Sequence, residues 1–513
     1  MFTLPDIAGR YPVGATTFAI PLNDPQVIGS GKLRRPSGNV TREPALLLEE
    51  VVFTAFYPAD ISNPSVDGTP PEKLRKSMEW VPKPVRETMH GYAHFAKSPF
   101  WMSEVFMSFV ASRLKLPVYP NVPLLDRASC SEDPHAQWPL VFFSHGLSGT
   151  RTTYSHLCIR LASQGKVVLA MEHRDGTAPV VMSHFASTAN KGYKPKVKFY
   201  LHPEDVKYEL KEEAAKIAFR EDQLLFRRME IYLAYRGFAD FTNARPPPQA
   251  EMPLLGDVHI VHGCSAHEIL KHGPFWSSWT TGRMQFSEDV DVVGHSFGGA
   301  TVLSILSNPP PSLAFRDSFI HPEALPITHA LVLDPWLEPL PTPGPAPNIE
   351  ATRDACTPHI LVLNSEQFTL WTDHFARLQG VVSSWHSEHG REGGREPNTT
   401  PDTASSSHKG ESEPVIVQAK LLTLIRAKHV SFSDFSVIPP LGNVSHTGRQ
   451  VLRIIGDLAV AFLSDEDGRE LGNVLMGLHI RDMEVEHKGE VKGAPPGRRK
   501  RRIVGEVGEV IIH

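Results

Sequence analysis

The chain has 513 residues, of which 41% are hydrophobic, and its 52 Lys and Arg against 57 Asp and Glu give a formal net charge of −5. This apolar content is sufficient for a large buried core and excludes a wholly disordered chain. The near balance of charge provides no basic footprint for DNA or RNA, so nucleic acid is not an expected partner.

The first predicted elements lie in the N-terminal fifth of the chain. Residues 43–58 are rich in β-branched and aromatic side chains and end in a proline, which predicts early strands of a sheet. Around Phe100 the sequence FWMSEVFMSFVASRL spaces bulky apolar residues as a helix does, over more than one face. A buried helix and a helix that contacts lipid are both compatible with this pattern.

From residue 138 onward, short apolar runs alternate with segments of helical periodicity. Strands are predicted at residues 138–144, 166–171, 289–293, 329–333, 359–363 and 420–426, and helices at 154–162, 210–235, 298–307 and 449–463. Repeated βα units of this kind predict an α/β fold with a mostly parallel, doubly wound sheet and flanking helices.

Two polar segments interrupt or follow this pattern. Residues 383–414 are rich in Gly, Ser, Thr and charged side chains, which predicts a disordered insertion, and its His386 and His389 are expected to be solvated rather than metal ligands. We therefore expect one catalytic domain over residues 1–465. Residues 466–513 are expected to form a solvated tail with a basic cluster at 498–502, with a localisation signal or an anionic membrane contact as alternatives.

Cysteine usage and apolar runs indicate the compartment. The four cysteines are widely spaced and form no C-x-x-C pair, which favours a reducing environment. The N-terminus does not read as a signal peptide, and no run of about 18 apolar residues occurs. We expect a cytoplasmic protein that in addition contacts membranes peripherally.

The motif that carries chemistry is Gly294-His295-Ser296-Phe297-Gly298, a G-x-S-x-G pentapeptide. The pentapeptide alone is a weak signal, but it follows the apolar run VDVV and precedes the helical run GATVL. This strand, tight turn and helix are what a nucleophile elbow of an α/β-hydrolase requires. The alternative is a glycine-rich turn with a hydroxyl cap. We predict that Ser296 is a nucleophile.

A serine nucleophile needs a histidine as base and a carboxylate to orient the imidazole, in the chain order Ser, acid, His for an α/β-hydrolase. Asp334 directly follows the apolar strand HALVL, and His429 directly follows KLLTLIRA. Both positions are at the carboxyl ends of strands, where side chains can reach the site. We predict Asp334 as the acid and His429 as the base, with His374 and His446 as competing histidines.

The oxyanion of an acyl-transfer intermediate needs preorganised N–H donors. One donor is expected to be the backbone of Phe297, and the second the backbone of Leu147 in the loop SHGLSG. A phosphate-binding loop is the alternative for this segment, but no lysine follows its glycines as such a loop requires. The next strand ends in Glu172-His173-Arg174-Asp175, whose charges are expected to pair and brace the walls of the site.

Six segments, taken in order, resemble the platelet-activating-factor acetylhydrolase family of serine esterases. They are PLVFFSHGLSGTRTTYS, LASQGKVVLAMEHRDGTA, VVGHSFGGATV, LVLDPWLEPL, LVLNSEQF and KHVSFSDF, and the resemblance extends over roughly residues 12–463. It implies that Ser296, Asp334 and His429 form the triad and that Leu147 and Phe297 supply the oxyanion hole. These are the residues reached above from mechanism.

The resemblance implies calcium-independent hydrolysis of the short or oxidised sn-2 acyl group of glycerophospholipids. The expected partner is a phospholipid substrate, with transient contact to a lipid surface, and we expect no cofactor and no metal. A general carboxylesterase or lipase acting on soluble short-chain esters would use the same triad and remains the alternative. A non-catalytic binding protein with this fold is a further alternative, although such proteins usually lack a triad member.

Overall fold

The structure is a computed structural model in which the placement of most of the chain can be described. The described residues are 2–34, 40–99, 101, 113–183, 197–242, 255–256, 258–261, 273–315, 318–348, 358–387, 419–438, 446–464, 468–490 and 499–513. The helix expected around Phe100 lies almost wholly outside these residues, as does most of the polar insertion.

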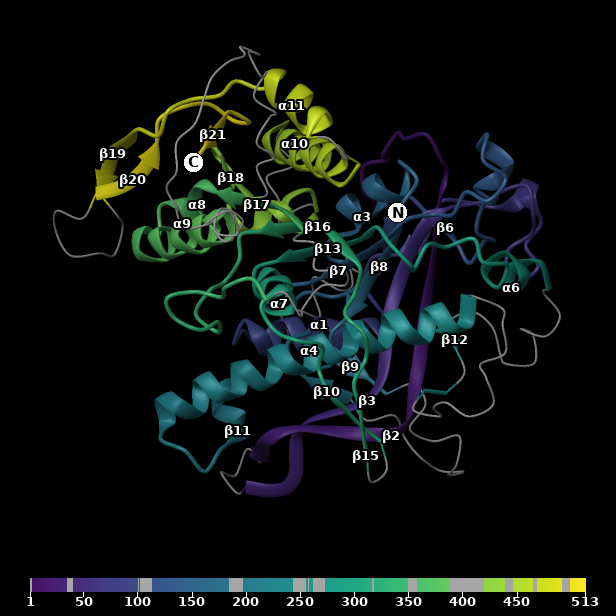
Figure 1. The fold of residues 1–513 in the computed structure, drawn as a ribbon, viewed down its shortest axis with the longest axis horizontal. Helices are drawn as coiled ribbons and strands as arrows, with labels where there is room; N and C mark the ends of the chain where they lie inside the picture. Colours follow the sequence, from purple (N-terminus) through teal and green to yellow (C-terminus); the bar gives the residue numbers. More distant parts are fainter. Residues whose placement is uncertain are drawn as a thin grey trace, which may run out of the picture.

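A large twisted sheet runs through the centre of the molecule (Figure 1). Its strands follow the order β11-β2-β3-β8-β7-β13-β16-β17-β18-β21, and the short β6 and β12 pair with β2. Their bounds are β2 Val13–Arg34, β3 Val40–Pro58, β6 Tyr119–Pro120, β7 Leu140–Ser144, β8 Val167–Glu172, β11 Val206–Lys207, β12 His259–Ile260, β13 Val290–His295, β16 Ile327–Leu333, β17 His359–Ser365, β18 Ala419–Leu424 and β21 Val510–Ile512. In this spatial order the run β8-β7-β13-β16-β17-β18 is parallel, and antiparallel strands join at both edges.

Among the described residues, four smaller sheets lie beside the main one. They are formed by β1 Phe2–Thr3, β5 Leu114–Leu116 and β4 Met78–Glu79; by β9 Val180–Met182 and β10 Val197–Phe199; by β14 Leu313–Phe315 and β15 Ser318–Ile320; and by β19 Val485–Glu490 and β20 Arg499–Ile503.

Helices cover both faces of the sheet, because successive side chains of each buried strand point to opposite faces. In β7, Leu140 and Phe142 join one apolar core, while Val141 and Phe143 join the other. The first core includes side chains of α4 Glu212–Thr242, α6 Gly273–Trp279, α7 Phe297–Leu306 and α9 Thr372–Ser387. The second includes α1 Val85–Phe95, α3 Ser155–Ala162, α10 His446–Leu463 and α11 Arg469–Met476, and a short α8 spans Glu366–Thr369.

The predicted fold is confirmed. Each strand and helix predicted from residue 138 onward is present, with small shifts at most ends, and the early strands of residues 43–58 form β3. Apolar runs predict the strands of this sheet well because parallel strands are buried on both faces. Among the helices in the described part of the chain, none is both long and apolar enough to cross a bilayer.

Two boundaries need correction. The polar insertion does not begin at residue 383, because α9 continues to Ser387 and the Trp385 side chain is only 2% exposed. The solvated tail predicted for residues 466–513 is wrong for most of its described part. Leu471 and Leu475 of α11 belong to the second core, and most of the basic cluster lies in β20, which pairs with β19. Strand β21 pairs antiparallel with β18 at the edge of the main sheet. Val510 and Ile511 are buried there, and the apolar area they remove from water favours this pairing.

Candidate active site

Ser296 lies on the sharp turn between β13 and α7, with φ 57° and ψ −117°. The turn closes because both flanking positions are glycine. A Cβ at Gly294 would lie 2.1 Å from the Gly298 carbonyl oxygen, and a Cβ at Gly298 would lie 1.9 Å from the Ser144 carbonyl oxygen. The predicted strand, strained turn and helix are therefore present.

Replacing Gly298 by Ala is expected to destabilise the fold by about 3 kcal/mol, because the new methyl group overlaps backbone atoms that cannot rotate away. Esterase activity should fall as well, since the displaced carbonyl, that of Ser144, directly precedes the loop opposite Ser296. Denaturant unfolding with kcat measured on the folded fraction checks both effects. The control is Gly380→Ala in α9, where a Cβ has no neighbour within 4 Å. A Gly298→Ala protein as stable as this control would contradict the prediction.

Asp334 follows β16 directly, and its side chain is fully buried. The backbone N–H of Ser365 donates to Oδ1 and the Ser365 hydroxyl donates to Oδ2, both at 2.6 Å. The third donor is Nδ1 of His429, at 3.0 Å from Oδ2. Asp334 is thus held by the end of β17 in an orientation that leaves Oδ2 facing the imidazole.

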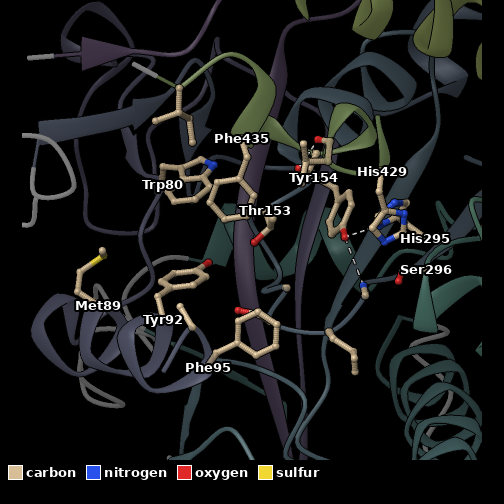
Figure 2. A pocket seen from close by; sticks show the side chains of 18 of the residues that line it. Trp80, Met89, Tyr92, Phe95, Thr153, Tyr154, His295, Ser296, His429 and Phe435 are labelled. Atoms are coloured by element: carbon tan, nitrogen blue, oxygen red, sulfur yellow. Dashed lines mark hydrogen bonds between the residues drawn. The ribbon is translucent and has the colours of Figure 1, made fainter. Parts of the chain in front are cut away.

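His429 follows β18 and is held on both ring faces. The Phe368 ring stacks on it at 4.3 Å between centroids with an interplanar angle of 5°, and His295 lies against it at 4.4 Å. The Nδ1 bond to Asp334 places the proton on Nδ1 and leaves Nε2 as a proton acceptor. Ser296 and His429 line the same pocket (Figure 2). The structure therefore brings the three predicted residues to one edge of the sheet.

His374, one of the two competing histidines, does not fit the role of base. In His374, which belongs to α9, Nε2 accepts the backbone N–H of Leu337, and burial lowers the pKa to about 4. It is also not among the described residues that line the pocket beside Ser296. His446 is the first residue of α10, and its side chain lies outside the described part of the structure.

Sequence reasoning did not assign a role to His295, which the structure places against the site. Its ring is fully buried, and Nδ1 is 2.8 Å from the Tyr154 hydroxyl oxygen, which also lies 3.4 Å from the Gly146 nitrogen. Burial, then the neighbouring His429, holds the pKa of His295 well below its usual value. The histidine of the pentapeptide was the only signal, and a motif match does not say where that ring packs.

His295, Asp334 and His429 each offer one ligand atom, and these atoms lie within 4.8 Å of one another. Such a group could in principle hold a metal ion. Both Asp334 oxygens, however, accept hydrogen bonds from Ser365, and Oδ2 also accepts one from His429. A metal would have to displace these bonds, so the arrangement suits an orienting carboxylate better than a metal ligand.

The loop after β7 runs against Ser296. A Cβ at Gly146 would lie 2.9 Å from the Ser296 Cβ, and Leu147 lines the pocket. Phe297 is the first residue of α7, a position whose N–H has no acceptor within the helix. Both predicted oxyanion donors are therefore next to Ser296, and their role stays a prediction.

The Glu172–Asp175 segment pairs its charges, as expected for a brace. Arg174 donates to Glu172 and Glu50, Arg151 also contacts Glu172, and Asp175 pairs with Arg227 of α4. His173 Nδ1 is 2.6 Å from Glu230, another residue of α4. The sequence did not reveal these partners on α4, because a charged stripe on a long helix usually faces solvent.

A largely apolar pocket of about 680 Å³ opens beside Ser296 (Figure 2). Its wall is formed by side chains of α1, of the segment before it and of the turns after His429, namely Trp80, Met89, Tyr92, Ala93, Phe95, Phe435 and Ile438. Asp434 links this wall to α3. Its carboxylate accepts hydrogen bonds from the Trp80 indole and from the backbone N–H groups of Ser155 and His156, which belong to α3.

The parallel sheet, the strained serine turn after β13 and the Asp–His pair after β16 and β18 define this chain as an α/β-hydrolase. A family model described as platelet-activating factor acetylhydrolase, isoform II, matches residues 2–466. The chain belongs to this family, whose members are carboxylic-ester hydrolases, and the resemblance inferred from the sequence is confirmed.

Three individual relatives are between 24% and 28% identical to this chain. The chain is 26% identical over 419 residues to a Schizosaccharomyces pombe protein provisionally named a phospholipase A2, covering 80% of this chain and 78% of that protein. It is 28% identical over 296 residues to the platelet-activating factor acetylhydrolase of Canis lupus familiaris, covering 56% of this chain. The corresponding protein of Gallus gallus is 24% identical over 308 residues, covering 60% of this chain. These matches span 51% of the dog protein and 60% of the chicken protein.

Proposed function

We propose that the chain is a calcium-independent serine esterase that hydrolyses the short or oxidised sn-2 acyl group of glycerophospholipids. The observation that carries the proposal is the 3.0 Å bond between His429 and Asp334 beside Ser296, at one end of an apolar pocket. Family membership and the names of the relatives support the phospholipid ester as substrate.

In the proposed mechanism the Ser296 Oγ attacks the carbonyl carbon of the sn-2 ester, and His429 Nε2 takes the hydroxyl proton. Asp334 keeps the Nδ1 proton in place and stabilises the imidazolium that forms. The N–H groups of Leu147 and Phe297 bind the oxyanion. His429 then protonates the leaving lysophospholipid oxygen, which leaves an acyl group on Ser296.

Water completes the cycle. His429 takes a proton from a water molecule as the water attacks the acyl-enzyme carbonyl, and a second oxyanion forms in the same hole. Collapse of this intermediate releases the carboxylic acid and returns the proton to Ser296. The same five residues thus serve both half-reactions.

The pocket supports an apolar substrate. Its wall of aromatic and aliphatic side chains can bind hydrocarbon, and none of the described lining residues is Asp, Glu, Lys or Arg. The two histidines of the lining, His295 and His429, lie at the end that holds Ser296 (Figure 2). We also infer a cytoplasmic enzyme that contacts lipid surfaces transiently. The free thiols of Cys130 and Cys158 favour a reducing compartment, and the 66% exposed Trp101 suits contact with an interface.

The test compares three substrates in the presence of a calcium chelator: a phospholipid with an sn-2 acetyl group, one with a long sn-2 chain, and a soluble short-chain ester. We expect acid release from the acetyl phospholipid at a rate at least tenfold above that from the long-chain one, whether the lipid is dispersed or in vesicles. Hydrolysis of the soluble ester alone would replace the proposal by a general carboxylesterase. Loss of phospholipid hydrolysis in the presence of the chelator would contradict the proposed independence of calcium.

A further inference from the structure

A stripe of buried polar residues on α4 faces the loops that follow β7 and β8. Gln223, Arg227 and Glu230 are spaced at i, i+4 and i+7, so they share one face of the helix, and all three side chains are fully buried. A 31-residue helix that buries three polar groups in a row pays a desolvation cost unless each is matched by a partner. The partners are therefore informative.

Arg227 is the centre of this stripe and is fixed by three acceptors. Its Nε donates to Asp175 Oδ2 at 2.8 Å, Nη1 donates to the His145 carbonyl oxygen at 2.7 Å, and Nη2 donates to Thr177 Oγ1 at 2.5 Å. Charge-assisted bonds from a planar guanidinium define direction as well as distance. Gln223 adds a bond to the Asp175 carbonyl oxygen, so the acceptors are themselves held.

The first consequence concerns the loop that carries Leu147. The His145 carbonyl, which Arg227 holds, lies two residues before Leu147 and directly before the close approach of Gly146 to Ser296. On the far side of Leu147, the Ser148 N–H donates to the Thr177 carbonyl oxygen at 2.7 Å, and Thr177 is itself bound to Arg227. The guanidinium therefore fixes this loop on both sides of the predicted donor.

The second consequence concerns Phe297. The guanidinium carbon of Arg227 lies 4.5 Å from the centroid of the Phe297 ring, which is a cation–π contact inside the core. The same Nη1 also lies 3.5 Å from Thr301 Oγ1, one turn further along α7. One side chain thus contacts both of the segments that supply the predicted oxyanion donors.

We propose that Arg227, held by Asp175, is a positioning residue that sets the separation of the Leu147 and Phe297 N–H donors. The proposal rests on the proposed function, because it assigns Arg227 a part in the same oxyanion hole. Preorganised donors stabilise the transition state only when they match the position of the oxyanion, and small displacements cost large factors in rate. Arg227 acts through the two donors rather than by contact with substrate.

The experiment measures kcat and KM of Arg227→Met on a soluble p-nitrophenyl ester, normalised to active sites titrated to completion with a fluorophosphonate. We expect kcat to fall at least 30-fold with KM within threefold. A trifluoromethyl ketone, whose adduct with Ser296 is tetrahedral, should bind more weakly by a similar factor. A purely structural role would lower the titrated fraction of sites but change neither kcat per site nor the inhibitor constant.

Two further variants keep the test decisive. Arg236→Met removes a partly exposed guanidinium from the same helix and should leave all three quantities unchanged. If Arg227→Met does not fold, Arg227→Lys retains a charge for Asp175 but cannot reach both loops at once, and its kcat should fall at least tenfold. Wild-type kcat in a folded Arg227 variant overturns the inference, whereas activity that survives Ser296→Ala overturns the proposed function instead.

Discussion

Replacing Ser296 by Ala is expected to lower kcat by on the order of 10⁶-fold, to the level left by binding and the oxyanion donors alone. Ser296 carries the only hydroxyl group on the turn between β13 and α7. No other group there can form the acyl-enzyme in the proposed mechanism. Stability should change by less than about 0.5 kcal/mol, because alanine retains the Cβ and the substitution removes one oxygen at the pocket surface. Acid release and thermal unfolding measure the two effects.

The matched control for this prediction is Ser304→Ala. Ser304 is a buried serine of the same helix, α7, and is not among the described residues lining the pocket. Its replacement should leave kcat within twofold. Comparable activity in Ser296→Ala and Ser304→Ala would contradict the assignment of the nucleophile, as would fluorophosphonate labelling that survives the loss of Ser296.

The part of the fold that could be predicted is the part in which local pattern and tertiary environment agree. Strands β7, β13, β16 and β17 are short, contain apolar runs and are largely buried, so each is marked by its own sequence. The three triad candidates follow from the same pattern, because Ser296 and Asp334 directly follow β13 and β16, and His429 lies five residues after the end of β18. Parallel strands bring their carboxyl ends to one edge of the sheet, and the predicted residues meet there.

The rest depends on contacts that no local pattern encodes. Arg227 lies in a helix with alternating charges, and only docking against the Asp175 loop distinguishes its buried side from the solvated one. The pocket wall is similar, since Trp80 and Phe435 are far apart in sequence and are joined through Asp434. Strand β21 was missed because three apolar residues at the end of a basic segment are too few to indicate a strand.

Three of the seven non-glycine residues with positive φ in the described part of the chain lie at the site, and the sequence did not indicate this strain. Ser148, Ser296 and Asp334 have φ values of 60°, 57° and 41°, in a region that side chains other than Gly seldom occupy. Ser148 lies in the loop opposite the nucleophile, Ser296 is the predicted nucleophile on its turn, and Asp334 is the predicted acid. Such strain persists only where surrounding contacts over-determine the backbone, and it favours preorganisation over stability at these positions.

The replacement Asp334→Asn is expected to lower kcat by about 10⁴-fold with little change in KM. Ser365 N–H donates to Oδ1, so the amide oxygen of Asn must take that place and its NH₂ group must take the place of Oδ2. That NH₂ would face Nδ1 of His429 and require it to accept a hydrogen bond. The imidazole proton would then sit on Nε2, which could no longer accept the Ser296 proton.

Asn is the informative substitution because, like Asp, it tolerates the positive φ of this position, whereas Ala would add backbone strain to the loss of the carboxylate. We therefore expect Asp334→Asn to fold with near wild-type stability, and NMR of the histidine ring nitrogens should report the change of tautomer at His429. Asp373→Asn, at an exposed position in the first turn of α9, is the control and should retain full activity. Full activity in Asp334→Asn would show that another carboxylate orients His429. A loss of activity with the proton still on Nδ1 would show that Asp334 acts through its charge rather than by fixing the tautomer.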